Sequence, residues 1–569
     1  MLRTQPTGAQ NGQRPRAAAA CTLRRVTSND CAYNAPEISQ LLIALEEATR
    51  ATPERGPGVF VPPAGGELDQ AMANFHHFVF GRRGSGKTTL LRHIERKLKD
   101  EGRATVWIDQ ELFMALSYPD VLVSSVLAVM EGVRTAVANA GEAPRPTSGL
   151  RDRIRARRER RGVAGSRRGL LSRLNQVISN LSVLKFAPQD RTIEWTRKVG
   201  AESAAEALGS VKVGHGSVAV DAGAKGSEKQ SNEVTSSETI QSSKEEYLER
   251  SLTDFREILI DAGREIGGGF VFLDEFYRVN RADQPLVLGY MHRLVKDTGF
   301  WLKVGSVRYW TTPYSGGSPP RGMQETQDAN VISLDRGLQL VDSTGTFLET
   351  ILTNIAEPST ADIRKLLTGG ALKRLVLASG GVARDYLRLA AQAIHQARNR
   401  GPSAKVGSHR VMAEDVNQAA GQTAPAKLND LRQDAPEEAA TLEVLLADLT
   451  EFCRARKAAY FLIDNQDAGL ASKIDQLQDL RFAHLLFESE TVPDEGSRRH
   501  KVLLLDVSHL SAQRALEVDF EGWQERENRR RRQLVYHEGA GAERVSPVAK
   551  SSPAVLPPPA LPLFEDESK

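Results

Sequence analysis

The sequence predicts an α/β fold, in which a parallel sheet covered by helices is followed by a helical segment and a small α+β module. Short apolar runs at 77–80, 104–109 and 270–274 indicate buried strands, and segments with helical spacing separate them. A glycine-rich loop joins the first run to the helix that follows it. Strands that alternate with helices form parallel sheets, because each connection must cross over the sheet.

Composition indicates an ordinary soluble protein with room for two to four domains. The chain has 569 residues, of which 40% are hydrophobic and 26% are charged. Cys21, Cys31 and Cys453 have no C-x-x-C spacing and cannot form a disulfide framework, so a reducing, cytoplasmic setting is expected. No apolar stretch reaches the roughly 18 residues of a membrane span, so we expect no membrane contact.

The first part of the chain predicts a βαβ unit. A helix is expected at 37–50, and a Pro- and Gly-rich connector follows it at 52–66. Strand 77–80, helix 90–98 and strand 104–109 then come in the order that a parallel sheet requires.

An insertion of about 141–245 interrupts this alternation. It contains a basic run, Arg151 to Arg168, and an amphipathic stretch, 170–184. Residues 211–227 are rich in Gly, Ser and Val, a composition that suits a hairpin, and 227–244 is a polar run. We expect the insertion to be partly flexible.

Strands and helices alternate again after the insertion, and two further parts follow. The expected elements are helix 247–259, strand 270–274, helix 286–295 and strands 301–307 and 331–334. Helix-forming residues then predominate at 348–397 and again at 437–456. The small module that ends the folded part has strand 460–463, helix 470–480 and strands 483–487 and 502–507.

The segment GRRGSGKT, Gly81 to Thr88, matches the phosphate-binding pattern G-x-x-x-x-G-K-[ST]. Glycine lets backbone N–H groups point inward and form an anion nest, and the N-terminus of the next helix adds partial positive charge. Lys87 is expected to reach the β- and γ-phosphates, and Thr88 to bind Mg²⁺. The residues expected to contact the nucleotide are Gly81, Arg82, Arg83, Gly84, Ser85, Gly86, Lys87, Thr88 and Thr89.

The segment FVFLDEF, 270–276, is an apolar strand that ends in two carboxylates. A Mg²⁺ and nucleotide site needs such groups opposite the phosphate loop. Asp274 is therefore expected to hold Mg²⁺, and Glu275 to orient and deprotonate the attacking water. An ordinary acidic turn would look the same in isolation, but the phosphate loop in the same chain favours the functional interpretation.

Two further positions are candidates for sensing the γ-phosphate. Ser306 ends the strand 301–307, where a hydroxyl can lie between the phosphate loop and the acidic pair. Arg384 starts a helix after Gly380 and Gly381, and its guanidinium suits phosphate geometry. An ordinary strand end and a surface arginine are the alternative interpretations.

These four motifs, in this order, resemble the AAA+ superfamily of P-loop ATPases, nearest to the origin-recognition and replication-initiator clade and to the STAND signalling ATPases. The resemblance implies a P-loop NTPase core, with Walker A at Gly81 to Thr88, Walker B at 270–275, sensor 1 at Ser306 and sensor 2 at Arg384. The segment HRVMAEDV, 409–416, resembles the entry into the last lid helix of that clade. The implied cofactors are ATP and Mg²⁺.

The chain departs from the family pattern in three ways. The interval between Asp109 and residue 270 is unusually long, and sensor 1 lacks the common Asn. The arginine finger that a neighbouring subunit normally supplies is not marked, and Arg293, Arg308 and Arg321 are all candidates.

By analogy with that clade, the C-terminal module is expected to be winged-helix-like. Its candidate recognition helix carries Lys473 and Arg481 against Asp475 and Asp479, so protein contacts are favoured over direct DNA reading. No cluster of His or Cys has metal-ligand spacing. The predicted parts are a disordered extension (1–35), the ATPase core (36–345), a helical lid (346–430), the winged-helix-like module (436–520), and a basic, then Pro-rich, disordered tail (521–569).

The motifs predict an ATP hydrolase that uses Mg²⁺ and drives a conformational switch or a DNA- or protein-remodelling step. The alternative is a nucleotide-gated signalling or scaffold ATPase, STAND-like and related to anti-phage defence, with slow hydrolysis. A P-loop kinase is disfavoured, because Asp274 and Glu275 suit attack by water. DNA is a candidate partner through two basic runs, Arg151 to Arg168 and Arg526 to Arg532, although such runs are also common on solvated surfaces. Protein partners or self-assembly are also expected.

Overall fold

The computed structural model describes most of the chain. The described residues are 32–50, 60–62, 65–140, 150–188, 193–199, 208–213, 236–401, 409–492, 498–511, 519–520, 522 and 531–541; for 150–165, 193–199, 208–213 and 236–241 only the backbone is described. The basic run that ends at Arg532 lies almost entirely outside these residues.

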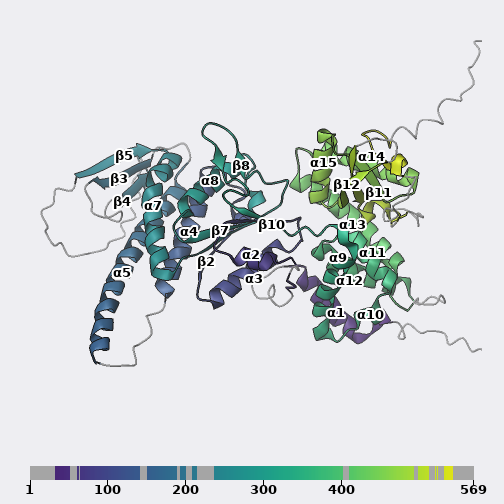
Figure 1. Ribbon diagram of the computed structural model, residues 1–569, viewed down its shortest axis with the longest axis horizontal. Helices are drawn as coiled ribbons and strands as arrows, with labels where there is room; N and C mark the ends of the chain where they lie inside the picture. Colours follow the sequence, from purple (N-terminus) through teal and green to yellow (C-terminus); the bar gives the residue numbers. More distant parts are fainter. Residues whose placement is uncertain are drawn as a thin grey trace, which may run out of the picture.

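A five-stranded parallel sheet forms the centre of the protein, with strand order β10–β1–β7–β6–β2 (Figure 1). The sheet confirms the predicted α/β fold, and each predicted core strand is present within one residue of its expected bounds. β7 lies between β1 and β6, as expected for the strand that carries Ser306. The strands are β1 (His77–Phe80), β2 (Ala104–Asp109), β6 (Gly269–Asp274), β7 (Phe300–Ser306) and β10 (Asn330–Ser333).

Helices cover both faces of this sheet because alternate strand residues point to opposite sides. Val271 and Leu273 of β6 pack toward one face, and Phe270 and Phe272 toward the other. The second face is covered by α2 (Glu67–Met72) and α3 (Lys87–Asp100). The first face is covered by α4 (Asp120–Asn139), α7 (Lys244–Ile266) and α8 (Gln284–Val295).

Helix α4 is long and apolar enough, by length and composition, to cross a membrane, which corrects the expectation that no segment reaches that threshold. Sixty-one per cent of its most apolar window is buried within the protein, and the core helix of a soluble protein passes the same test. Its apolar residues pack against the central sheet and the helices beside it.

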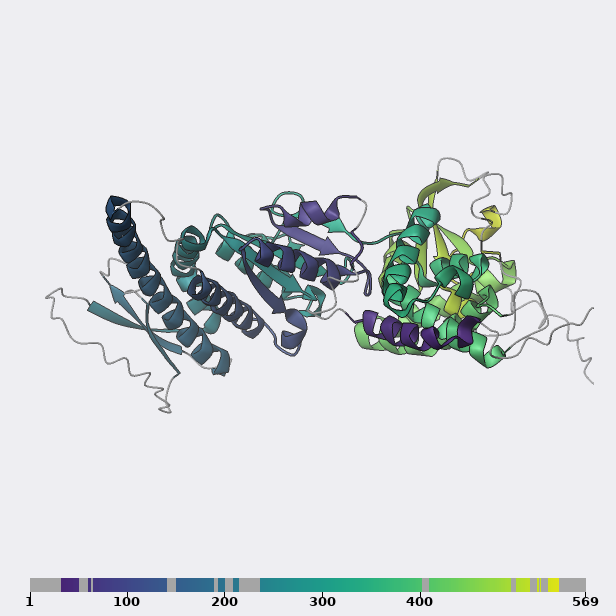
Figure 2. The same cartoon turned by 90° about the horizontal axis from the view of Figure 1, so that it is seen from below.

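The described part of the insertion contains both helix and strand. It forms one long helix, α5 (Leu150–Phe186), and a three-stranded antiparallel sheet in the order β4–β3–β5, seen beside the central sheet in Figures 1 and 2. These strands are β3 (Ile193–Val199), β4 (Leu208–Val213) and β5 (Ser236–Ser242). Residues 211–213, the start of the hairpin predicted at 211–227, belong to β4 and pair with β3, while 214–227 lie outside the described residues.

A bundle of helices forms the lid. Its members are α9 (Val341–Ala356), α10 (Ile363–Leu366), α11 (Gly369–Ser379), α12 (Ala383–Arg400) and α13 (Ala413–Asp434). Helix α1 (Pro36–Ala48) packs on this bundle and not on the central sheet, although the sequence placed it in the ATPase core (Figure 2). Tyr33, which was assigned to a disordered extension, is fully buried in the same cluster.

The C-terminal module has the predicted order of helix, strand, helix and two paired strands. Its sheet is antiparallel, in the order β11–β13–β12, and its apolar core is continuous with that of the lid. The elements are α14 (Ala439–Arg456), β11 (Tyr460–Asp464), α15 (Ala468–Asp479), β12 (Ala483–Thr491), β13 (Arg499–Leu505) and α16 (Val507–Leu510). Part of the predicted disordered tail belongs to this module, since Leu534 and Tyr536 are buried and the Tyr536 hydroxyl donates to Asp448.

Candidate active site

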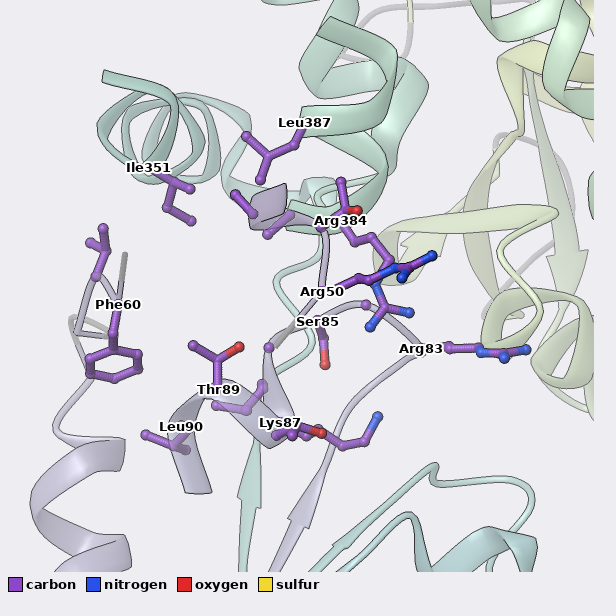
Figure 3. Close-up of a pocket in the computed structure, with 18 of the residues that line it drawn as sticks. Arg50, Phe60, Arg83, Ser85, Lys87, Thr89, Leu90, Ile351, Arg384 and Leu387 are labelled. Atoms are coloured by element: carbon purple, nitrogen blue, oxygen red, sulfur yellow. The ribbon is translucent and has the colours of Figure 1, made fainter. Parts of the chain in front are cut away.

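A cavity of about 720 Å³ opens between the phosphate loop and the lid. Figure 3 shows apolar Phe60, Ile351 and Leu387 on one side of it, and basic Arg50, Arg384 and Lys87 on the other. An apolar wall opposite a cationic wall suits a ligand with a flat ring at one end and phosphates at the other.

The phosphate loop has the backbone geometry that its glycines were predicted to allow. Gly84 and Gly86 have φ of +89° and +99°, values that residues with a Cβ rarely adopt. A Cβ on Gly84 would lie 2.9 Å from Cβ of Arg384, so the loop touches the lid directly. Helix α3 begins at Lys87, and its N-terminus therefore points into the cavity.

Lys87 lies at the base of the loop and is buried. Its Nζ donates to the carbonyl oxygens of Gly81 at 2.8 Å and Arg82 at 3.3 Å. Burial lowers the pKa of this ammonium, while Glu275, Asp335 and Asp274 act against the shift. An ammonium held in this way is ready to stabilise added negative charge in the cavity.

Thr88 and Asp274, the two residues predicted to bind Mg²⁺, lie within hydrogen-bond distance of each other. Burial, and then the charge of Glu275, raises the pKa of Asp274 to about 6, while a hydrogen bond from Thr88 lowers it. The charge of Lys87 also lowers the pKa of Asp274, but no lysine or arginine among the described residues forms a direct ion pair with this carboxylate. One carboxylate and one hydroxyl beside a phosphate site are donors that Mg²⁺ uses, and these residues fit the ion.

Glu275 follows Asp274 directly and lines the cavity. Its backbone has φ 53° and ψ 34°, the left-handed conformation that is uncommon outside glycine. This conformation turns the side chain out of the strand direction at the end of β6. Non-glycine residues held in such conformations are concentrated at functional sites, which supports the predicted role of Glu275.

Arg384, at the start of α12, contacts the phosphate loop from the lid. Its backbone N–H donates to the carbonyl oxygen of Gly84 at 3.3 Å, and its side chain lines the cavity. Burial, together with Arg388, Arg481 and Arg83, lowers the pKa of its guanidinium. The cation is thus placed in an environment that favours an incoming anion.

Four predicted site residues do not line the cavity. Asp274 is buried beside Thr88 and does not reach the cavity surface. Gly81 and Arg82 do not line the cavity, and the Arg82 side chain turns away to contact the lid and the C-terminal module. Ser306 is fully buried, and its hydroxyl is 2.5 Å from that of Thr311, so it does not face the cavity as predicted. The sequence does not reveal where the side chains of Arg82 and Ser306 point. Arg82 contacts segments that are distant in the chain, and Ser306 contacts Thr311 in the loop after β7.

The candidate arginine fingers are engaged outside the cavity. Arg293 pairs with Glu249 of α7 through two nitrogens, and Arg308 pairs with Glu325 at 2.8 Å. Arg321 lies exposed in β9 (Arg321–Gly322), which pairs with β8 (Tyr314–Ser315). None of the three lines the cavity.

Several lining residues escaped the sequence motifs. They come from the connector after α1, from the segments after β6 and β10, and from the lid helices, and they share no pattern in the chain. The sequence predicted only that part of the lid is helical, not which of its side chains face a cavity. The missed residues include Arg50, Phe60, Val61, Arg278, Arg336, Phe347, Ile351 and Leu387.

Lys87, Thr88, Glu275 and Arg384 line the cavity, and Asp274 lies beside Thr88 where β6 ends at one edge of the sheet. They bring together two cations, two oxygen donors of the kind that Mg²⁺ prefers, and a second carboxylate. The carboxyl ends of parallel strands meet at this edge, which is where α/β folds bind ligands. The arrangement suits binding of a nucleoside triphosphate and attack by water on its last phosphate.

No protein-family model and no curated protein matches the chain. Its structure is similar to the ORC1 protein of Aeropyrum pernix in complex with DNA, with 12% identity, a TM-score of 0.33, and coverage of 84% of this chain and 95% of that one. It is also similar to the Walker-type ATPase of Pyrococcus abyssi, with 10% identity, a TM-score of 0.33, and coverage of 78% of this chain and 92% of that one. Cdc6p from Pyrobaculum aerophilum has 13% identity and a TM-score of 0.31, with coverage of 81% of this chain and 96% of that one. Because these TM-scores are low, the fold is assigned from the sheet, the phosphate loop and the lid of the chain itself.

Proposed function

We propose that this chain, which has the fold of the AAA+ P-loop ATPases, binds ATP with Mg²⁺ and hydrolyses it to drive a conformational switch or a DNA- or protein-remodelling step in the cytoplasm. The observation that carries the proposal is the meeting of Lys87, Thr88, Glu275 and Arg384 around one cavity. Arg384 comes from the lid and the others from the sheet edge, so a ligand that touches all four couples the two parts.

Each residue has a defined part in the proposed reaction. Thr88 and Asp274 would hold Mg²⁺, which neutralises charge on the phosphates when it is bound. Lys87 and Arg384 stabilise the negative charge that develops on the transferred phosphoryl group. Glu275 orients a water molecule and accepts its proton.

The replacement Glu275→Gln tests this proposal. The amide keeps the size of the side chain but cannot accept a proton, so ATP hydrolysis should fall by about 100-fold or more while ATP binding persists. Steady-state phosphate release and equilibrium binding of ATP measure the two properties separately. The exposed Glu111→Gln, at the rim of the same cavity, is the matched control. Wild-type turnover by Glu275→Gln would rule out this residue as the base.

The second candidate is a nucleotide-gated signalling or scaffold ATPase with slow hydrolysis. The ion pairs of Arg293 and Arg308 favour it, because a guanidinium already held by a carboxylate is less free to serve a neighbouring subunit. Turnover measured with and without DNA separates the two candidates. Fast turnover that DNA stimulates supports remodelling, and slow turnover that DNA does not change supports signalling.

DNA is proposed as a partner because of the basic run from Arg151 to Arg168 at the start of α5. Arg167 already pairs with Glu265 of α7, so the remaining arginines would have to supply the contact. Phosphate contacts release counterions, and the DNA affinity should therefore fall steeply as salt rises. A filter-binding titration from about 50 to 200 mM salt measures this slope. Absence of binding, or a flat response to salt, would exclude the contact.

A further inference from the structure

Arg82, the second residue of the phosphate loop, is nearly buried and joins four segments of the chain. Its backbone N–H and Nε both donate to Oδ1 of Asp335, at 2.7 and 3.2 Å. Its Nη2 donates to the carbonyl oxygens of Gly380 at 2.9 Å and Arg336 at 3.3 Å. A guanidinium with this many partners is fixed in position, because its planar donors each need a matching acceptor.

The remaining nitrogen of Arg82 reaches the C-terminal module. Nη1 lies 3.1 Å from Nδ1 of His484 in β12, and the other ring nitrogen of His484 lies 3.0 Å from Oδ2 of Asp506. An arginine can only donate, so Nδ1 of His484 must accept and its Nε2–H must donate to Asp506. The structure therefore requires one neutral tautomer of this fully buried ring.

The far end of this chain of contacts is also fixed. Lys427 of α13 donates to Oδ2 of Asp506 at 2.8 Å, and the backbone N–H of Ser508 donates to Oδ1 at 3.0 Å. Burial of Asp506 is offset by Lys427 and His484, and its pKa stays well below the ordinary value. A permanent carboxylate thus orients the His484 ring toward Arg82.

Close packing leaves the histidine ring no alternative position. Gly380, in the turn between α11 and α12, has φ +58°, and a Cβ at that position would lie 2.0 Å from Nδ1 of His484. The ring is therefore held between the lid turn and the phosphate loop. Any shift of β12 would be passed to Arg82.

We propose that Arg82 and His484 are positioning residues for nucleotide binding, through which the C-terminal module holds the phosphate loop in the shape that receives the phosphates. This inference rests on the proposed ATP binding. The physical link runs through the backbone, because the carbonyl oxygen of Arg82 accepts a hydrogen bond from Nζ of Lys87. A displaced Arg82 would change the position of that carbonyl and of the Arg83–Gly84 turn beside it.

A second pair of contacts anchors neighbouring parts of the site to the same half of the protein. Arg83 donates to Asp434 at the end of α13 at 2.9 Å, and Figure 3 shows its side chain directed away from the cavity. The backbone N–H of Tyr309, in the loop after β7, donates to Asp479 of α15 at 2.8 Å. The lid and module therefore contact both the phosphate loop and the loop that follows the sensor strand.

Paired replacements of His484 test the proposal. His484→Leu removes both ring nitrogens, and it should raise the dissociation constant for Mg²⁺·ATP about tenfold, since a buried donor of a charged group then lacks its acceptor. In His484→Gln, the amide oxygen can accept from Arg82 while the amide NH₂ donates to Asp506. This variant should bind ATP within about threefold of the wild type. Isothermal titration calorimetry of the full chain measures each constant.

Two further variants separate positioning from general stability. Leu503→Ala creates a cavity in β13, away from Arg82, and should lower the unfolding temperature while leaving ATP affinity unchanged. Arg82→Lys cannot span the same set of acceptors and should weaken ATP binding without any change in the module. When Arg82→Lys is combined with His484→Leu, the dissociation constant for Mg²⁺·ATP should rise by less than the product of the two single increases, because both replacements disrupt the same contact.

The outcomes are distinct. If the wild-type chain binds no ATP, the proposed function and this inference both fail. If the wild type binds ATP and His484→Leu binds it equally well, the inference alone is overturned. Equal weakening by His484→Leu and Leu503→Ala would also overturn it, because loss of module stability would then explain the effect.

Discussion

At the scale of single residues, burial of carboxylates has different consequences at two positions. Asp274 is buried beside Glu275 and Thr88, where a divalent cation would compensate its charge. Asp479 is buried at the contact between α15 and the loop at Tyr309, and its pKa rises to about 7. The raised pKa shows that ionisation of this second carboxylate is unfavourable in the folded protein.

We predict that Asp479→Asn stabilises the protein at neutral and higher pH. The folded-state pKa of Asp479 is above the unfolded value of about 3.9, so stability is lost as pH rises from about 4 to about 7. Asparagine still accepts from Tyr309 but carries no charge. The free energy of unfolding should increase by about 4 kcal/mol at pH 8, since each pKa unit between the unfolded and folded values is worth about 1.4 kcal/mol, and it should change little at pH 4.

Thermal or urea unfolding at the two pH values measures the effect, and Asp100→Asn at the exposed end of α3 is the control. An equal change at both pH values would show that the charge of Asp479 is not the cause.

At the scale of elements, α5 belongs to the ATPase core for half of its length. Leu174, Val177, Leu181 and Leu184 are fully buried, and α5 packs against α4. Arg173 forms an ion pair with Asp261 of α7, which fixes the same face. The sequence predicts the amphipathic stretch but places it in a partly flexible insertion. Charge and composition do not indicate which surface of the protein its apolar face packs against.

We predict that Leu174→Ala destabilises the protein by about 2–5 kcal/mol, the usual cost of a cavity at a fully buried leucine. Ser179→Ala, at an exposed position of the same helix, should change stability by no more than about 0.5 kcal/mol. Chemical unfolding followed by far-UV circular dichroism compares the two. Equal stability of Leu174→Ala and the wild type would show that α5 is dispensable for the core.

At the scale of the whole molecule, the lid and the C-terminal module form one body with a shared core, against which α1 also packs. Figure 2 shows this body beside the central sheet, with the insertion at the opposite end. Arg481 of the module donates to both oxygens of Asp385 in α12, at 2.8 and 3.0 Å, and all of these groups are nearly buried. Arg384, the residue before Asp385 in α12, lines the cavity, so the ion pair lies directly beside the cavity wall.

We predict that Arg481→Met loosens this body, because Asp385 would remain buried without its counterion. Breaking such a pair costs about 3–5 kcal/mol. The variant should show a lower unfolding temperature, faster proteolysis and a larger radius of gyration by small-angle X-ray scattering. Arg432→Met removes an exposed ion pair with Glu443 and should leave all three measurements unchanged. If Arg481→Met has the radius of gyration and the unfolding temperature of the wild type, the ion pair does not hold the lid and the module together.

The sequence by itself determined the strands of the central sheet, the phosphate loop and the carboxylates after β6, because these depend on local periodicity and on chemistry within a few residues. It also predicted that Arg384 faces the phosphate loop, through the resemblance of its motif. Only the tertiary structure decided that Arg82 and Ser306 turn away from the cavity, that Arg50 and Phe60 line it, and that half of α5 is core. Those outcomes depend on which distant segments meet, since a side chain turns toward whichever partner best satisfies its charge, hydrogen bonds and apolar surface.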